Sequence, residues 1–147
     1  MSDILERLWG KEFAEKYRQA LARAQQIPAA KLDAIKKFAV EALKANPERA
    51  YVKYDNLDVV LVQTANDPSK FPVVRTGAGN FKIGMIWAGS QSMRGPFISV
   101  FVADKDVATK LASTPGKPWL LVGKLQERTF EGDITYSFRV QGVIELE

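Results

Sequence analysis

Between Pro68 and Ala103 the chain carries no Asp or Glu, although the whole sequence holds 17 acidic residues among 147. The window does contain basic and aromatic residues, interleaved along it: Lys70, Arg75, Lys82 and Arg94, with Phe71, Phe81, Trp87, Phe97 and Phe101. A surface that binds single-stranded nucleic acid needs positive charge along the phosphates and flat rings on which unpaired bases stack. Buried strands, which exclude charge of either sign, are the other interpretation, but they do not explain why only the acids are missing.

Other kinds of chemistry have little support in the composition. The chain has no Cys and no His, so disulfides, thiolate nucleophiles, and the commonest acid–base residue and metal ligand are all missing. The acidic pairs Asp55/Asp58 and Asp104/Asp106 fit turns and helix caps. We therefore expect a protein that is not an enzyme and uses no cofactor or metal.

The sequence shows neither a membrane-spanning segment nor a signal peptide. No apolar run approaches the roughly 18 residues of a membrane span, and the charged start MSDILERLWGKEF does not resemble a signal peptide. We expect a cytoplasmic protein with no membrane partner.

Two helices are expected before residue 47. Apolar residues recur every fourth position in the first helix, which Gly10 could kink, and at helical spacing in the second. Pro28 ends the first helix and opens the second, and Asn46-Pro47 stops it. The short connection favours an antiparallel helical hairpin over residues 1–47, a candidate surface for a second copy or a partner protein.

After Pro47 the hydrophobic period changes from 3.6 to 2, which indicates strands. The expected strands are Leu57–Thr64, Val73–Arg75 with Phe81–Trp87, Phe97–Ala103, Trp119–Arg128 and Ile134–Leu146, with a short helix at Asp104–Ser113. A helix between the third and fourth of five strands is the order of an OB-fold, which binds ligands on strands 2–3 and on loops 1–2 and 4–5. The prediction is an α+β chain with a five-stranded OB-fold β-barrel at 48–147, preceded by the helical hairpin.

Alternation along these strands separates core residues from candidate contacts. Ile98, Val100 and Val102 suit the interior, which leaves Phe97, Ser99 and Phe101 on the opposite face. If Phe97 and Phe101 do not face a ligand, they pack beneath the helices. Trp87 ends its strand beside the polar loop AGSQSMRG, either as a ligand contact or as a plug of the barrel. Arg94 lies in that loop with no acidic neighbour in sequence.

The last two strands carry further basic residues on their polar faces. Lys124 and Arg128 alternate along one strand, and Arg139 lies among Thr135, Ser137 and Gln141 on the other. These side chains could contact a phosphate backbone or form an ordinary solvated face. Phe130 at the hairpin tip is a further candidate for a base contact, unless it tucks against the barrel rim.

The chain resembles the single-stranded DNA-binding protein family over roughly residues 57–146. The residues that carry this resemblance are LDVVLVQTANDPSKFPVVRTGAG, and further on FISVFVADKDVATKLASTPGKPWLLVGKLQERTFEGDITYSFRVQGVIEL. The resemblance implies binding of single-stranded DNA through stacked aromatic rings and basic residues. By position Phe97 matches an aromatic of the family at the start of strand three, and Trp87 lies near one at the end of strand two.

Two departures from that family concern partners. The sequence lacks the acidic tail that bacterial members use to recruit proteins, and it begins with the helical segment that they lack. Partner recruitment and oligomeric state are therefore expected to differ. The remaining alternatives are an OB-fold adaptor subunit that binds protein through its helices and aromatics, and an RNA-binding OB protein.

Overall fold

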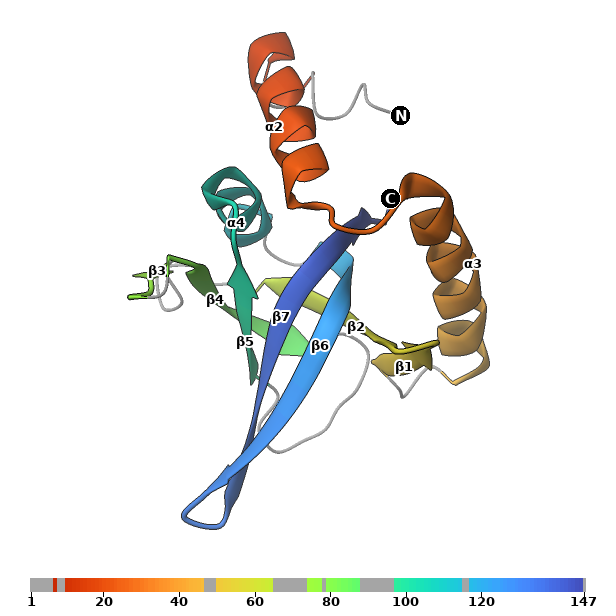
Figure 1. The fold of residues 1–147 in the computed structure, drawn as a ribbon, viewed down its shortest axis with the longest axis vertical. Helices are drawn as coiled ribbons and strands as arrows, with labels where there is room; N and C mark the ends of the chain where they lie inside the picture. The colour runs from red at the N-terminus through yellow and green to blue at the C-terminus, as the bar shows by residue number, and fades with distance from the viewer. Residues whose placement is uncertain are drawn as a thin grey trace.

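The computed structural model describes residue 7 and residues 10–46, 50–64, 74–77, 79–87, 97–114 and 117–146. These residues form an α+β structure of three helices and one sheet (Figure 1). The helices are α2 (Lys11–Ala24), α3 (Ala29–Ala45) and α4 (Lys105–Ala112). The strands are β1 (Tyr51–Tyr54), β2 (Leu57–Thr64), β3 (Val74–Arg75), β4 (Phe81–Trp87), β5 (Phe97–Val102), β6 (Pro118–Phe130) and β7 (Asp133–Glu145).

The sheet curls into a partly closed ring. Its strand order is β1-β2-β6-β7-β5-β4-β3, and β2 also pairs with β4, so that β2, β6, β7, β5 and β4 follow one another around the ring. The neighbours pair antiparallel except β5 and β7, which run parallel. Helix α4 connects β5 to β6, as the sequence predicted.

One apolar cluster fills the ring, and we call it the inner cluster. It takes alternate residues from every strand of the ring, such as Val62, Met85, Val100 and Phe138, all fully buried. Ile98, Val100 and Val102 belong to it, so the predicted inward face of β5 is confirmed. This alternation follows from the pleat, which sends successive side chains to opposite faces.

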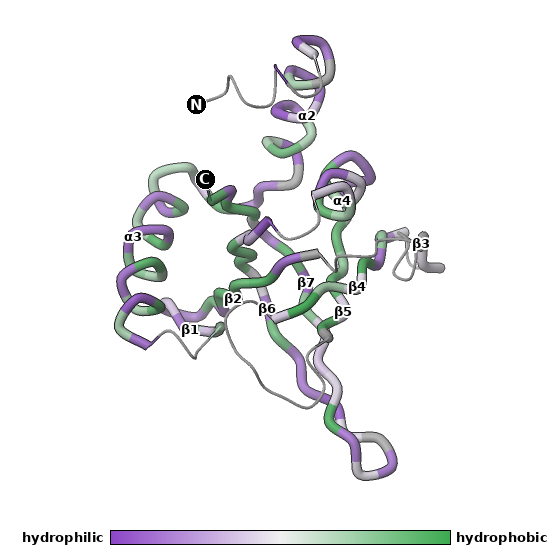
Figure 2. The backbone as a smooth tube through the Cα atoms, turned by 180° about the vertical axis from the view of Figure 1, so that it is seen from behind, coloured by the Kyte–Doolittle hydropathy of each residue, from purple (hydrophilic) through white to green (hydrophobic). Residues whose placement is uncertain are grey.

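A second apolar cluster, the outer cluster, lies on the outside of β2 and β6 beneath α3. It includes Ile35 and Ala39 of α3, with Val59 of β2 and Leu120 of β6. Since β2 and β6 bury both faces at this point, their sequences read as continuous apolar runs, VVLV and WLLV. In Figure 2 the residues of α3 alternate between hydrophobic and hydrophilic, as expected for a helix with one buried side.

The two N-terminal helices do not form the predicted antiparallel hairpin, and that prediction is wrong. Over the described residues α2 packs on α4 and β7, while α3 packs on β1 and β7 (Figure 1). Their connection is held to the sheet because the Gln25 side chain bonds both to the N–H (2.8 Å) and to the carbonyl oxygen (2.7 Å) of Val143. The apolar sides of α2 and α3 therefore cover different parts of the structure. The division of the chain at residue 47 stays a prediction.

The starts of α4 and α2 are set by the residues that precede them. Asp104 caps α4, because its carboxylate accepts hydrogen bonds from the N–H groups of Asp106 (2.9 Å) and Val107 (3.3 Å). Gly10 precedes α2 at φ 90, a conformation that glycine adopts without strain. The sequence predicted a helix with Gly10 inside it, but Gly10 is not helical and α2 begins at the next residue.

Strand β1 was not expected from the sequence. It pairs with β2 through a tight turn in which Asp55 adopts φ 58. Strands β6 and β7 form a hairpin that is longer than predicted at its turn end and projects from the body of the molecule (Figure 1). No helix among the described residues is long and apolar enough to cross a membrane.

Candidate functional site

The outward side chains of β4, β5, β7 and β6 form one continuous surface, which we call the cationic face. In its first row Lys82 lies opposite Phe101, Phe101 beside Arg139, and Arg139 opposite Lys124. Facing residues on paired strands lie roughly 5 Å apart. The register therefore places basic residues on three strands, and the Phe101 ring on the fourth, in one line across the sheet.

A second row lies beside the first and consists of Gly84, Ser99, Ser137 and Gln126. Beyond it, Ile86 pairs with the backbone of Phe97, and Thr135 lies opposite Arg128. Their neighbours in the body of the sheet point into the ring and are buried, namely Ile83, Met85, Ile98, Val100 and Phe138, whereas toward the hairpin turn Glu127, Thr129 and Ile134 are exposed. The cationic face thus has one row rich in cations beside one row of small and polar residues.

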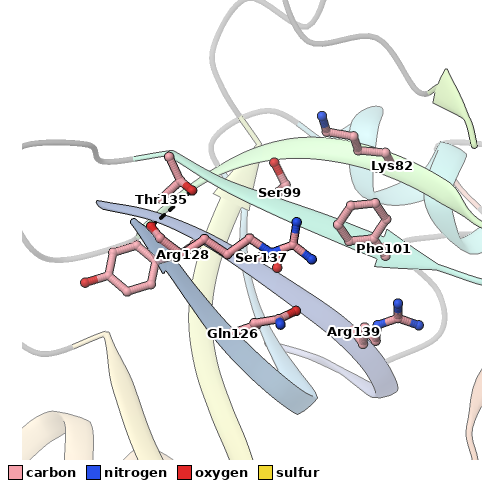
Figure 3. Close-up of a pocket in the computed structure, with 9 residues that line it drawn as sticks. Lys82, Ser99, Phe101, Gln126, Arg128, Thr135, Ser137 and Arg139 are labelled. Carbon is pink, nitrogen blue, oxygen red and sulfur yellow. Dashed lines mark hydrogen bonds between the residues drawn. The ribbon is translucent and has the colours of Figure 1, made fainter. Parts of the chain in front are cut away.

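A pocket of about 230 Å³ opens on the cationic face (Figure 3). It takes side chains from all four strands: Lys82, Ser99, Phe101, Gln126, Arg128, Thr135, Tyr136, Ser137 and Arg139. No carboxylate is among these lining residues. The pocket is smaller than the roughly 300–1,000 Å³ that is usual for enclosed small-molecule sites, so it suits part of a larger ligand better than a whole one.

The basic residues of the pocket keep their charge available for a ligand. Lys82, Arg128 and Arg139 are exposed, and none forms an ion pair with a carboxylate in the described part of the chain. Elsewhere basic side chains do find acidic partners, as Lys117 does with Glu145 at 2.5 Å. Three positive charges that have no acidic partner among the described residues make this face attractive to an anion.

Lys124 ends the first row in a different environment. Its ammonium group donates a hydrogen bond to the backbone oxygen of Asn56 in the β1–β2 turn. The next residue, Leu125, donates its N–H to the buried carboxylate of Asp58 at 2.8 Å. Asp58 thus satisfies a backbone group of β6 just beyond the register shift between Val122 and Gly123. The outcome is that β2 positions the segment of β6 that carries Lys124 and Gln126.

The predicted aromatic contacts differ in position. Phe101 is half-buried, lines the pocket and lies on the outward side of β5. Trp87 has the inward parity of β4, packs against the inner cluster and meets Tyr136 edge to face, with ring centroids 5.5 Å apart. This is the position expected of a plug at the edge of the ring. Any contact of Trp87 with a ligand stays a prediction.

Several predicted contacts cannot be placed as side chains. Lys70 and Arg94 lie outside the described residues. Arg75, Phe97 and Phe130 have described backbones only: Arg75 pairs with Phe81, Phe97 with Ile86, and Phe130 with Asp133 next to the hairpin turn. Their roles stay predictions.

Other lining residues were not among the predicted contacts: Ser99, Gln126, Thr135, Tyr136 and Ser137. Sequence alternation already put Thr135 and Ser137 on the face of Arg139, and Gln126 on that of Lys124 and Arg128. Polar uncharged residues are common on solvated faces, so their type gave no further signal. The missing information was the parallel pairing of β5 with β7, which joins the two halves of the pocket.

The arrangement can bind an anion and one flat ring side by side. Among the described residues no group of three or more carboxylates could hold a metal ion, and the sequence has no His or Cys. An extended ligand with repeated negative charge fits a face on which cations lie around an aromatic ring. No protein-family model matches this chain, and no curated protein matches it.

Proposed function

We propose that the chain is a non-catalytic OB-fold protein that binds single-stranded DNA on the cationic face. The ring supports the OB-fold assignment, because β2, β4, β5, β6 and β7 correspond in order to strands one to five of that fold, and α4 lies between strands three and four. In the same correspondence, the cationic face begins on β4 and β5, the strand 2–3 surface with which OB-folds bind.

One observation carries the proposal: Lys82, Arg139 and Arg128 surround Phe101 on a pocket without carboxylates. The cations suit a phosphate chain, and the exposed part of the Phe101 ring suits a base. A duplex keeps its bases stacked on one another, whereas the unpaired bases of a single strand can stack on an aromatic ring within a cationic surface.

The positions of the helices support this function over that of an adaptor subunit. Apolar residues of α2 and α3 such as Tyr17, Ile35 and Ala39 are already buried in the two clusters of this chain, whereas Phe38 of α3 is 44% exposed. The buried residues are therefore occupied within this chain and are not free for a partner. Binding of a second copy or another protein through the remaining helix surface stays an untested prediction.

The charge of the face can be tested through salt dependence. Each phosphate contact to a single strand contributes about 0.7 to the slope of log affinity against log salt concentration. We expect Lys82→Gln and Arg139→Gln each to reduce this slope by about 0.7 for a fluorescent oligo-dT measured by anisotropy. Lys37→Gln, which removes the same charge from an exposed position on α3, should leave the slope unchanged. Equal slopes for all four proteins would overturn the proposed binding face.

Phe101 can be tested separately from charge. Phe101→Ala should weaken oligo-dT binding by about 1–3 kcal/mol, the usual contribution of one stacked base. Phe101→Leu keeps an apolar side chain but removes the flat ring, and it should lose nearly as much. Both variants should melt close to the wild type, since Phe101 is half-exposed and outside the inner cluster. Affinity that survives both substitutions would contradict stacking at this position.

A parallel titration with oligo-U decides between DNA and RNA, because RNA recognition uses the 2′-hydroxyl.

A further inference from the structure

A row of uncharged hydrogen-bonding side chains crosses the middle of the cationic face. Ser99 lies beside Ser137 in the parallel β5–β7 pair, and Ser137 lies opposite Gln126 in the β6–β7 pair. On the far side of Ser99 the row ends in Gly84, which has no side chain. The cationic row of Lys82, Phe101 and Arg139 runs immediately alongside.

These three side chains are free to bond to a ligand. All line the pocket (Figure 3), and none forms a hydrogen bond to another described residue. Thr135 differs, since its hydroxyl donates to the backbone oxygen of Arg128 at 3.5 Å. The Gln126 amide offers both donors and an acceptor, and each serine hydroxyl can donate or accept.

Such groups are not needed for binding that ignores sequence. Positive charge and flat stacking surfaces are sufficient to hold any single strand, because every base has a π-face. Hydrogen-bonding groups beside the stacking ring instead face the edge of a base, and the edge is where the bases differ. A glutamine amide that pairs with a base edge through two hydrogen bonds distinguishes the matching base from others by about tenfold or more.

We propose that the pocket takes one nucleobase, stacked on Phe101, and reads its edge through Gln126 with Ser99 and Ser137. Affinity then depends on which base occupies this one position, while the phosphates flanking it contact Lys82, Arg128 and Arg139. The inference rests on the proposed single-strand binding and adds specificity to it.

The test uses short oligonucleotides of abasic deoxyribose phosphates that carry a single central base, either A, C, G or T. All four have the same charge, so differences in affinity report only the base. We expect the best base to bind about tenfold or more tightly than the weakest, and all four to bind more tightly than the fully abasic strand. Gln126→Ala should reduce the difference between bases to about twofold, and Ser137→Ala should reduce it in part.

Thr129→Ala is the matched control, because Thr129 is exposed on the same strand but points to the opposite side. It should keep the full preference. Equal affinity of the wild type for all four bases, above that for the abasic strand, would overturn the reading of the base edge and leave single-strand binding intact. A preference that persists in both Gln126→Ala and Ser137→Ala would also overturn it. Absence of binding to every strand, oligo-dT included, would instead overturn the proposed function.

Discussion

The substitution Gly123→Ala tests the close packing of β6 against β7, which positions the residues of the cationic face. Gly123 is buried in β6 at the register shift, opposite Val140 of β7. A Cβ atom there would overlap the carbonyl oxygen of Arg139, and it would lie 3.0 Å from the Arg139 carbonyl carbon and 3.1 Å from the Gln141 nitrogen. All three atoms belong to the backbone of β7, so no change of rotamer can make room.

The two strands must move apart, and the cost follows from that. Overpacking of a close-packed region costs about 1–3 kcal/mol and occasionally more, and a clash with backbone belongs at the upper end. For a protein of this size each kcal/mol lowers Tm by about 2–4 °C, so we expect a fall of about 6–12 °C. Because Arg139 belongs to the displaced segment, the folded variant should also bind oligo-dT more weakly. Circular dichroism melting gives Tm, and anisotropy well below Tm gives the affinity.

Two other glycines provide graded controls. At Gly142 a Cβ would meet the Gln25 Oε1 and Leu32 Cδ2 atoms, both at 3.0 Å. Both are side-chain ends that can shift, although Oε1 would weaken the hydrogen bond that it accepts from the Val143 N–H. Gly142→Ala should therefore cost less than Gly123→Ala. At Gly77 a Cβ would meet nothing within 4 Å, so Gly77→Ala should stay within about 0.5 kcal/mol of the wild type. If Gly123→Ala melted like Gly77→Ala and bound oligo-dT normally, the β6–β7 register that builds the cationic face would be refuted.

Three further substitutions test the supports of the sheet. Asp58→Ala removes the acceptor of the Leu125 N–H and of the Tyr51 hydroxyl, each at 2.8 Å. It should lower the free energy of unfolding, measured by urea titration, by about 1–3 kcal/mol. Asp58→Asn keeps one acceptor oxygen and should lose less. Gln25→Ala removes both hydrogen bonds to Val143 and should cost about 1–3 kcal/mol. Gln26→Ala should cost little, because Gln26 is exposed and, within the described part of the chain, bonds only through its backbone. Tyr17→Phe removes a buried hydroxyl that has no hydrogen-bond partner among the described residues, and it should raise Tm. Burial, and next the charge of Glu145, raise the pKa of the Tyr17 hydroxyl above its ordinary value of 10.0. Above about pH 10 the unfolded state therefore loses this proton while the folded state keeps it, so the stability of the wild type should fall as the pH rises. The advantage of Tyr17→Phe should therefore grow above pH 10, and a constant difference would contradict the burial of this side chain.

Much of the fold follows from local sequence signals. The run LDVVLVQT predicts β2 with the correct ends, and Asp104 marks the start of α4 as its cap. Strict alternation in β5 separates buried Val100 from half-exposed Phe101. These features depend on the pleat of a strand and on helix capping. Both act over a few neighbouring residues, so they can be predicted from a single sequence.

What the sequence did not show depends on contacts between distant residues. The amphipathic ridges of α2 and α3 show that each helix must bury one side, but not that each has a separate part of the sheet to cover. Strand β1 is short and lies at the edge of the sheet, so it has little pattern of its own. The meeting of Phe101 with Arg139 needs the parallel pairing of β5 and β7, two segments far apart along the chain.

The central claim is that the cationic face binds single strands in preference to duplex. The most direct test is an anisotropy titration of labelled oligo-dT at several salt concentrations, repeated with duplex DNA of the same length as competitor. We predict saturable binding that duplex competes for poorly, with a slope of log affinity against log salt of about −2, because Lys82, Arg128 and Arg139 each contribute about 0.7. Absence of binding at low salt, or equal competition by duplex, would contradict the account.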